Sequence, residues 1–157
     1  MGNTVLPLVL LGTLVLLLLA AGIEDAHRRT ISNWTNLAVA ALAPAWWWAQ
    51  GYAPWPDVPL QLLLAGVVFL LFVGAFALGQ MGGGDVKLIG ALALWLPIGP
   101  LVTLLLVMSI AGGAVTVVMM IERRLRRKTG ALEIPYGVAI AFAGLLSLRE
   151  PILNHLA

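Results

Sequence analysis

Six apolar runs occupy most of this 157-residue chain, with only short polar gaps between them. They cover about residues 5–21, 34–49, 58–78, 86–96, 101–121 and 134–148. A helix needs roughly 20 apolar residues to cross a bilayer. Charged residues make up 10% of the chain, against about 25% in a soluble domain. The pattern predicts an all-α, polytopic membrane protein of about six transmembrane helices, with residues 1–157 forming a single domain.

The basic residues predict how these helices are oriented. Eight of the nine fall in the gaps 24–33, 79–87 and 122–133. By the positive-inside rule these gaps are cytoplasmic, both termini are outside, and the tryptophan run 46–48 lies at the outer interface. Residues 5–22 look like a signal peptide, but the basic residues follow the apolar run, so we expect an uncleaved first helix. The same placement explains the pI of 9.5 without a nucleic-acid partner.

The fourth run, residues 86–96, is too short for a normal span. It would measure roughly 16 Å as a helix, about half of a hydrocarbon core of roughly 30 Å. We expect either that the preceding glycines dip into the membrane or that the bilayer thins there. Irregular backbone at that depth must be buried in protein or line a wet cavity.

Two acidic residues are the candidates for chemistry. Asp25 ends the first apolar run and Asp85 begins the fourth, and the predicted topology puts both on the cytoplasmic side. Two carboxyl groups brought close share a proton, so that one can act as a base on water and the other as an acid. A different interpretation stays open, because Asp85 could simply be the N-cap of the fourth helix.

Three blocks of sequence resemble the prepilin peptidase family, in family order and from one end of the chain to the other. They are Asp25-Ala26-His27-Arg28-Arg29-Thr30-Ile31-Ser32-Asn33, then Gly82-Gly83-Gly84-Asp85-Val86-Lys87-Leu88, and finally Glu133-Ile134-Pro135-Tyr136-Gly137-Val138-Ala139-Ile140. Ser32 departs from the pattern, since the family usually has proline there. We expect Ser32 or Asn33 to cap the second helix instead.

The resemblance is to the short, tight-adherence-pilus branch, and it implies an activity. A multi-pass peptidase of the bacterial inner membrane would cleave the basic leader of class III (type IV/Flp-like) prepilins after a glycine, at the cytoplasmic face. Asp25 and Asp85 would be the catalytic pair, with no metal and no cofactor. Longer members carry a cysteine-rich zinc domain and methylate the new N-terminus. This chain has no cysteine, so no N-methyltransferase activity is expected.

Other residues are expected to bind substrate or to support the site. They are Gly82, Gly83, Gly84, Lys87, Arg29, Asn33 and Tyr136. Lys87 is equally compatible with an anchor at the membrane interface. Glu24 and His27 are expected to be solvated. The stretch Arg123–Lys128 is expected to determine topology and to contact anionic lipid headgroups.

Two other functions remain open at this point. An archaeal-type preflagellin peptidase would use the same motif, whereas a presenilin-like protease would need a Pro-Ala-Leu block, which the chain lacks. A small proton or cation transporter could use Asp25, Asp85 and Lys87, because ionisable residues within membranes serve that purpose too.

Overall fold

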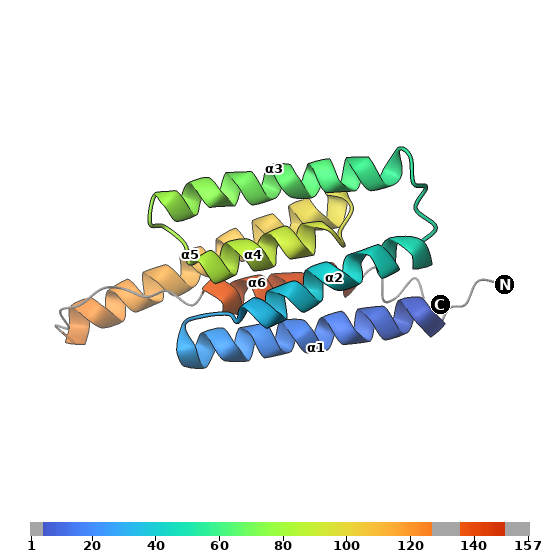
Figure 1. Ribbon diagram of the computed structural model, residues 1–157. Coiled ribbons are helices and arrows are strands. Elements are labelled where there is room, and N and C mark those ends of the chain that lie inside the picture. Colours follow the sequence, from blue (N-terminus) through green and yellow to red (C-terminus); the bar gives the residue numbers. More distant parts are fainter. Residues whose placement is uncertain (1–4, 127–135, 150–157) are drawn as a thin grey trace.

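The computed structural model describes residues 5–126 and 136–149, and within these ranges the chain is helical with no strand (Figure 1). The six helices are α1 (Val5–Arg28), α2 (Asn33–Ala49), α3 (Asp57–Ala77), α4 (Gly83–Ala93), α5 (Ile98–Arg126) and α6 (Tyr136–Ser147). The helices α1, α3 and α5 are long and apolar enough to cross a membrane, and α6 is a shorter apolar helix. The prediction of an all-α membrane protein is confirmed.

The helices run back and forth, which brings distant polar gaps together. The connection between α1 and α2, the connection between α3 and α4, and the end of α5 all lie toward the left in Figure 1, and we call this side the Asp85 end. The connection between α2 and α3 lies at the opposite end. The predicted gaps 24–33 and 79–87 therefore share one end. Arg127, Lys128 and Pro135 lie outside the described residues.

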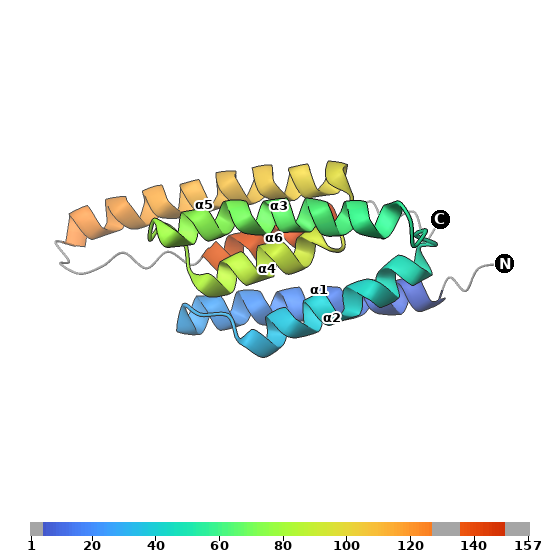
Figure 2. The same cartoon turned by 45° about the horizontal axis from the view of Figure 1, so that its top comes forward.

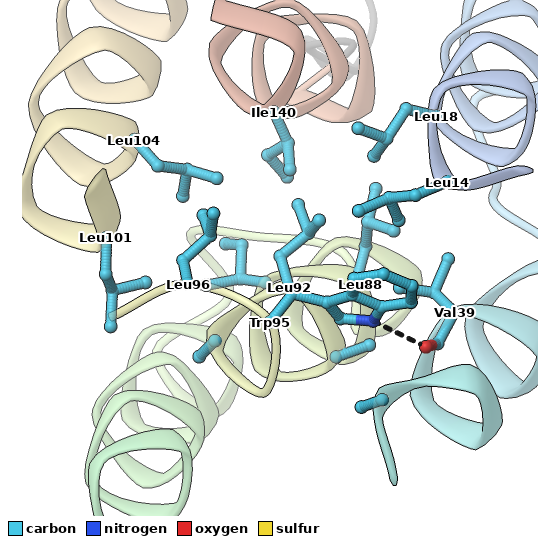
Figure 3. Close-up of a cluster of buried hydrophobic side chains, with 14 of the residues drawn as sticks. Leu14, Leu18, Val39, Leu88, Leu92, Trp95, Leu96, Leu101, Leu104 and Ile140 are labelled. Carbon is cyan, nitrogen blue, oxygen red and sulfur yellow. Dashed lines mark hydrogen bonds between the residues drawn. The ribbon is translucent and has the colours of Figure 1, made fainter. Parts of the chain in front are cut away.

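The short helix α4 is enclosed by the other helices. Together with α6 it lies between α1 and α2 on one side and α3 and α5 on the other (Figure 2). Eight of its 11 residues are buried. Its apolar side chains Leu88 and Leu92 point toward Leu14 and Leu18 of α1 and Ile140 of α6 (Figure 3). A helix in this position has no need to match the thickness of the bilayer, because protein surrounds it.

The predicted bounds of this helix were wrong by a few residues. It starts at Gly83 and ends at Ala93, so the irregular backbone comes after it, at residues 94–97. The last carbonyl groups of a helix have no partner within the helix. Side chains from α2 and α3 bind the carbonyls here: Trp46 Nε1 donates to Trp95 O at 3.1 Å, Trp47 Nε1 to Leu94 O at 2.7 Å, and Gln61 Nε2 to Ala93 O and Leu96 O at 2.7 and 2.8 Å. Irregular backbone is tolerated inside the bundle because its polar groups are paired.

The same contacts correct the prediction for the tryptophan run. Trp46 and Trp47 are 4% and 9% exposed, whereas Trp48 is 77% exposed. The Trp46 ring also stacks on Trp95, with ring centroids 5.5 Å apart. Only Trp48 is free to face the membrane interface, since the other two indoles are needed to pair the end of α4.

Candidate active site

Asp25 and Asp85 are both buried at the same end of the bundle although 60 positions separate them in the chain. Asp25 lies in the last turn of α1 and Asp85 in the first turn of α4, and they are only 3% and 7% exposed. They are close enough for the charge on Asp25 to act on Asp85. Buried carboxyl groups that influence each other electrostatically do not ionise independently.

The start of α6 holds the carboxyl group of Asp25. Val138 N–H donates a hydrogen bond to Asp25 Oδ2 at 3.1 Å. A Cβ atom added at Gly137 would lie 2.8 Å from Asp25 Cβ and Cγ, so α6 reaches Asp25 only because residue 137 is glycine. The free N–H groups at a helix N-terminus are well suited to bind a carboxylate. The third sequence block therefore contributes to the site through its backbone.

Asp85 is not the N-cap residue of α4, so the prediction of its position in the cap was wrong, but it takes part in capping the helix. Gly82 is the N-cap, with φ −74° and ψ 146°, and Asp85 is the third residue of the helix. The Gly82 backbone forms a hydrogen bond with the Asp85 carboxyl group. This bond resembles the reciprocal contact of a capping box, in which the third helical residue reaches back to the cap. It sets the direction in which the carboxyl group points.

The other two glycines of the run let α4 approach its neighbours. A Cβ atom at Gly84 would lie 3.1 to 3.3 Å from the N, O and Cβ atoms of Ile31, and one at Gly83 would lie 3.4 Å from the Phe76 ring. The Gly84 carbonyl accepts a hydrogen bond from Asn36 Nδ2 at 3.1 Å. The glycine run thus fits α4 between the α1–α2 connection and the end of α3.

The connection between α1 and α2 is built by local hydrogen bonds. Arg29 ends α1 with φ 55°, a left-handed conformation that often terminates helices. Ser32 Oγ accepts from Thr35 N at 3.1 Å and caps α2, as the sequence predicted. Glu24 was expected to be solvated, but its Oε2 atom accepts from Ser32 N at 2.9 Å and from Thr35 Oγ1 at 3.3 Å. Glu24 therefore fixes the position of this connection.

The remaining candidates surround the pair at different distances. Lys87 Nζ donates to Asn33 Oδ1 at 2.8 Å, which links α4 to the start of α2. The charge of Arg29 acts on Asp25. The Tyr136 ring packs over Gly112 of α5, while the next residue touches Asp25. His27 is exposed, as expected.

No group of three or more His, Cys, Asp or Glu side chains within residues 5–126 and 136–149 is arranged to hold a metal ion. What these residues do provide is two buried carboxyl groups, a type of group that can accept or donate a proton in catalysis. In the basic stretch Arg123–Lys128, Arg124 and Leu125 are exposed near the end of α5.

The fold and the site define a class: an all-helical membrane protein with two buried carboxyl groups at one end of the bundle, in the last turn of α1 and the first turn of α4. The chain belongs to the type IV leader peptidase family, whose family model matches residues 12–117. The match includes both Asp25 and Asp85 and indicates a peptidase. A search of curated proteins and a search of solved structures each found no match.

Three contributions were not predicted. Asn36 donates a hydrogen bond to the Gly84 carbonyl, and Ile31 packs against Gly84. Gly137 has no side chain, which lets Asp25 lie against it. Gly137 lies in a block that resembles the family, which was a usable signal. Nothing in the sequence distinguishes Asn36 from an ordinary polar residue near a helix start.

Proposed function

We propose that this protein is an aspartic endopeptidase that removes the short basic leader of class III prepilins after a glycine, at the cytoplasmic face of the bacterial inner membrane. The single observation that supports it best is the burial of both Asp25 and Asp85 at the same end of the bundle, where the charge of one acts on the other. Membership of the type IV leader peptidase family supports a leader-peptide substrate.

In the proposed reaction one carboxylate accepts a proton from a water molecule, whose oxygen attacks the scissile carbonyl carbon. The other carboxyl group donates its proton to the carbonyl oxygen. The tetrahedral intermediate then breaks its C–N bond, and the leaving amine takes up a proton from the first carboxyl group. One hydroxyl group of the intermediate returns a proton to the second carboxylate as the new C=O bond forms, which restores both groups. The bonds to Asp25 from Val138 and to Asp85 from Gly82 keep both groups oriented before the substrate arrives.

Two features make this end of the bundle suitable for a leader peptide. The polar gaps 24–33 and 79–87 lie at this end and contain Arg28, Arg29 and Lys87, as expected for the cytoplasmic side. Gly82, which is exposed before Asp85, presents backbone without a side chain, and this permits the close approach of an extended chain. We further propose that this chain does not methylate the new N-terminus.

The test is co-expression with a prepilin that has a basic leader, a glycine before the cleavage point and an apolar helix after it. We expect loss of the leader, detected by intact mass, in the wild type and not in Asp25→Asn or Asp85→Asn. The mature product should carry an unmethylated N-terminus. Asp57→Asn is the matched control, since Asp57 lies at the opposite end and binds Ala53 N.

Cleavage that persists in either Asp25→Asn or Asp85→Asn would contradict the catalytic pair. If none of several prepilins is cleaved while liposomes containing the protein conduct protons or cations, the peptidase proposal is wrong and transport is the better account.

A further inference from the structure

A groove lies between α2 and α3, with α4 as its floor. Its volume is about 620 Å³, within the range of ~300–1,000 Å³ that is typical of ligand sites. Small residues from all three helices line it, namely Ala40, Ala65, Gly66, Gly90 and Ala91. Small residues on membrane helices allow another helix to pack closely. The shape and chemistry of the groove suit an apolar helix.

One end of this groove is polar and adjoins the catalytic pair. Asn33, Asn36 and Lys87 line this end. Asn36 is 5% exposed and binds the Gly84 carbonyl, one residue before Asp85. Neighbouring residues of a helix point about 100° apart. A chain that leaves the groove at Asn36 therefore needs only to pass around the start of α4 to reach Asp85.

Asn36 also has an unused hydrogen-bond acceptor. Its Nδ2 atom donates to Gly84 O, but its buried Oδ1 atom accepts no hydrogen bond from the described residues. A buried polar atom without a partner is destabilising, because it has lost its hydrogen bonds to water and gained none in return. A lipid acyl chain in the groove could not supply the missing donor. The first turn of an α-helix could, because its first four N–H groups have no partner within the helix.

We propose that this groove binds the start of the apolar helix of the prepilin, with Asn36 Oδ1 accepting a backbone N–H from its first turn. This inference rests on the proposed function, since it concerns the same substrate. The scissile bond precedes the helix, and the polar end of the groove adjoins Asp85. Docking the helix with its N-terminus at Asn36 therefore directs the leader toward the catalytic pair.

The Oδ1 atom is covered in the structure, so docking requires a movement at the polar end. The hydrogen bond between Lys87 and Asn33 spans α2 and α4 at this end and is exposed. Since Asn33, Asn36 and Lys87 line the same end of the groove, we expect this exposed bond to open when the substrate backbone docks.

Filling the groove tests its role. A Cβ atom at Gly66 or at Gly74 would meet nothing within 4 Å, and both residues are on α3, but only Gly66 lines the groove. We compare kcat/KM for a full prepilin with kcat/KM for a peptide that ends shortly after the cleavage point. The ratio of the two should fall at least about tenfold in Gly66→Leu and stay unchanged in Gly74→Leu.

The proposed role of Asn36 Oδ1 as a hydrogen-bond acceptor is tested by changing the substrate. Semisynthetic prepilins carry an ester in place of one amide in the first turn of the helix, which removes a single N–H. In the wild type one ester position should lower kcat/KM about tenfold. The same ester should cost nothing extra in Asn36→Leu. A penalty of equal size in both enzymes would overturn the role of Asn36.

Binding can also be followed without cleavage. A photoreactive residue replaces Gly66 or Gly74 in the Asp85→Asn background, and we expect a cross-link to the prepilin helix from position 66 only. Cross-links to lipid alone would overturn the inference. If the wild type cleaves prepilins and Gly66→Leu leaves the ratio of the two kcat/KM values unchanged, the role of the groove is wrong and the proposed function stands. A wild type that cleaves no prepilin would overturn both.

Discussion

A Cβ atom on Gly137 would stand 2.8 Å from Cβ and Cγ of Asp25, so α6 and α1 meet at a position that has no room for a side chain. The contact lets the N-terminus of α6 reach the carboxyl group, where Val138 N–H binds Oδ2. One glycine thus connects the last described helix to a residue in the first.

Gly137→Ala should displace Asp25 or α6 and lower the cleavage rate by about 100-fold, since a shift of about 1 Å in a catalytic group can have that effect. The measurement is the initial rate of leader removal in detergent. Gly113→Ala is the control, because a Cβ atom there meets nothing within 4 Å. A wild-type rate in Gly137→Ala would show that the position of Asp25 does not matter.

The paired carboxyl groups predict a bell-shaped dependence of kcat/KM on pH. Activity needs one group protonated and the other ionised. At low pH both are protonated and no base remains, and at high pH both are ionised and no acid remains. Rates measured across the pH range with one purified prepilin would test this. A rate that rises steadily with pH would contradict a shared proton.

Gln61→Leu should destabilise the bundle without touching the catalytic pair. It leaves the carbonyls of Ala93 and Leu96 buried without this donor, at a cost of about 1–3 kcal/mol for each. Thermal unfolding in detergent should show a clear decrease in Tm. The exposed Gln80→Leu makes the same chemical change without removing a buried bond, and its Tm should remain close to that of the wild type.

Ser32→Ala removes the N-cap of α2 and should lower the free energy of unfolding by about 1 kcal/mol. Ser32→Asp keeps an acceptor for Thr35 N but places a second carboxylate beside Glu24, so it should recover only part of this loss. Denaturant unfolding of the purified variants gives the comparison. Equal stability of Ser32→Ala and the wild type would mean that Glu24 alone holds the connection.

The absence of cysteine in the sequence allows a direct test of orientation. Trp55→Cys and Gln80→Cys place single thiols at exposed positions near opposite ends of α3. A membrane-impermeant thiol reagent should label position 55 in intact spheroplasts and position 80 only after the membrane is opened. The reverse pattern would place the catalytic pair outside.

Much of this arrangement was predictable from the sequence. The apolar runs predicted six helices because burial in lipid or protein demands continuous apolar segments, and the basic gaps predicted which helix ends share a side. Asp25 and Asp85 were predicted as a pair from that shared side. The prediction that Ser32 caps α2 was also confirmed, because capping depends on a few neighbouring residues.

Tertiary contacts account for what the sequence did not reveal. Trp46 and Trp47 looked like interfacial residues, because only the folded bundle shows that the carbonyls after α4 need donors. Glu24 looked solvated because its partners, Ser32 and Thr35, approach it through a turn of the chain. The role of Gly137 depends on α6 packing beside a residue more than a hundred positions earlier.

The enclosure of α4 limits which segments of the protein can change in sequence during evolution. Its irregular C-terminal stretch is fixed by indole and amide donors from α2 and α3, and its core face is fully occupied. Sliding or rotating α4 would break these bonds together. If the proposed substrate is right, adaptation to different prepilin helices should therefore proceed through substitutions on α2 and α3, which form the walls of the groove. The segment from Gly82 to Leu96 should therefore vary little in sequence among orthologues.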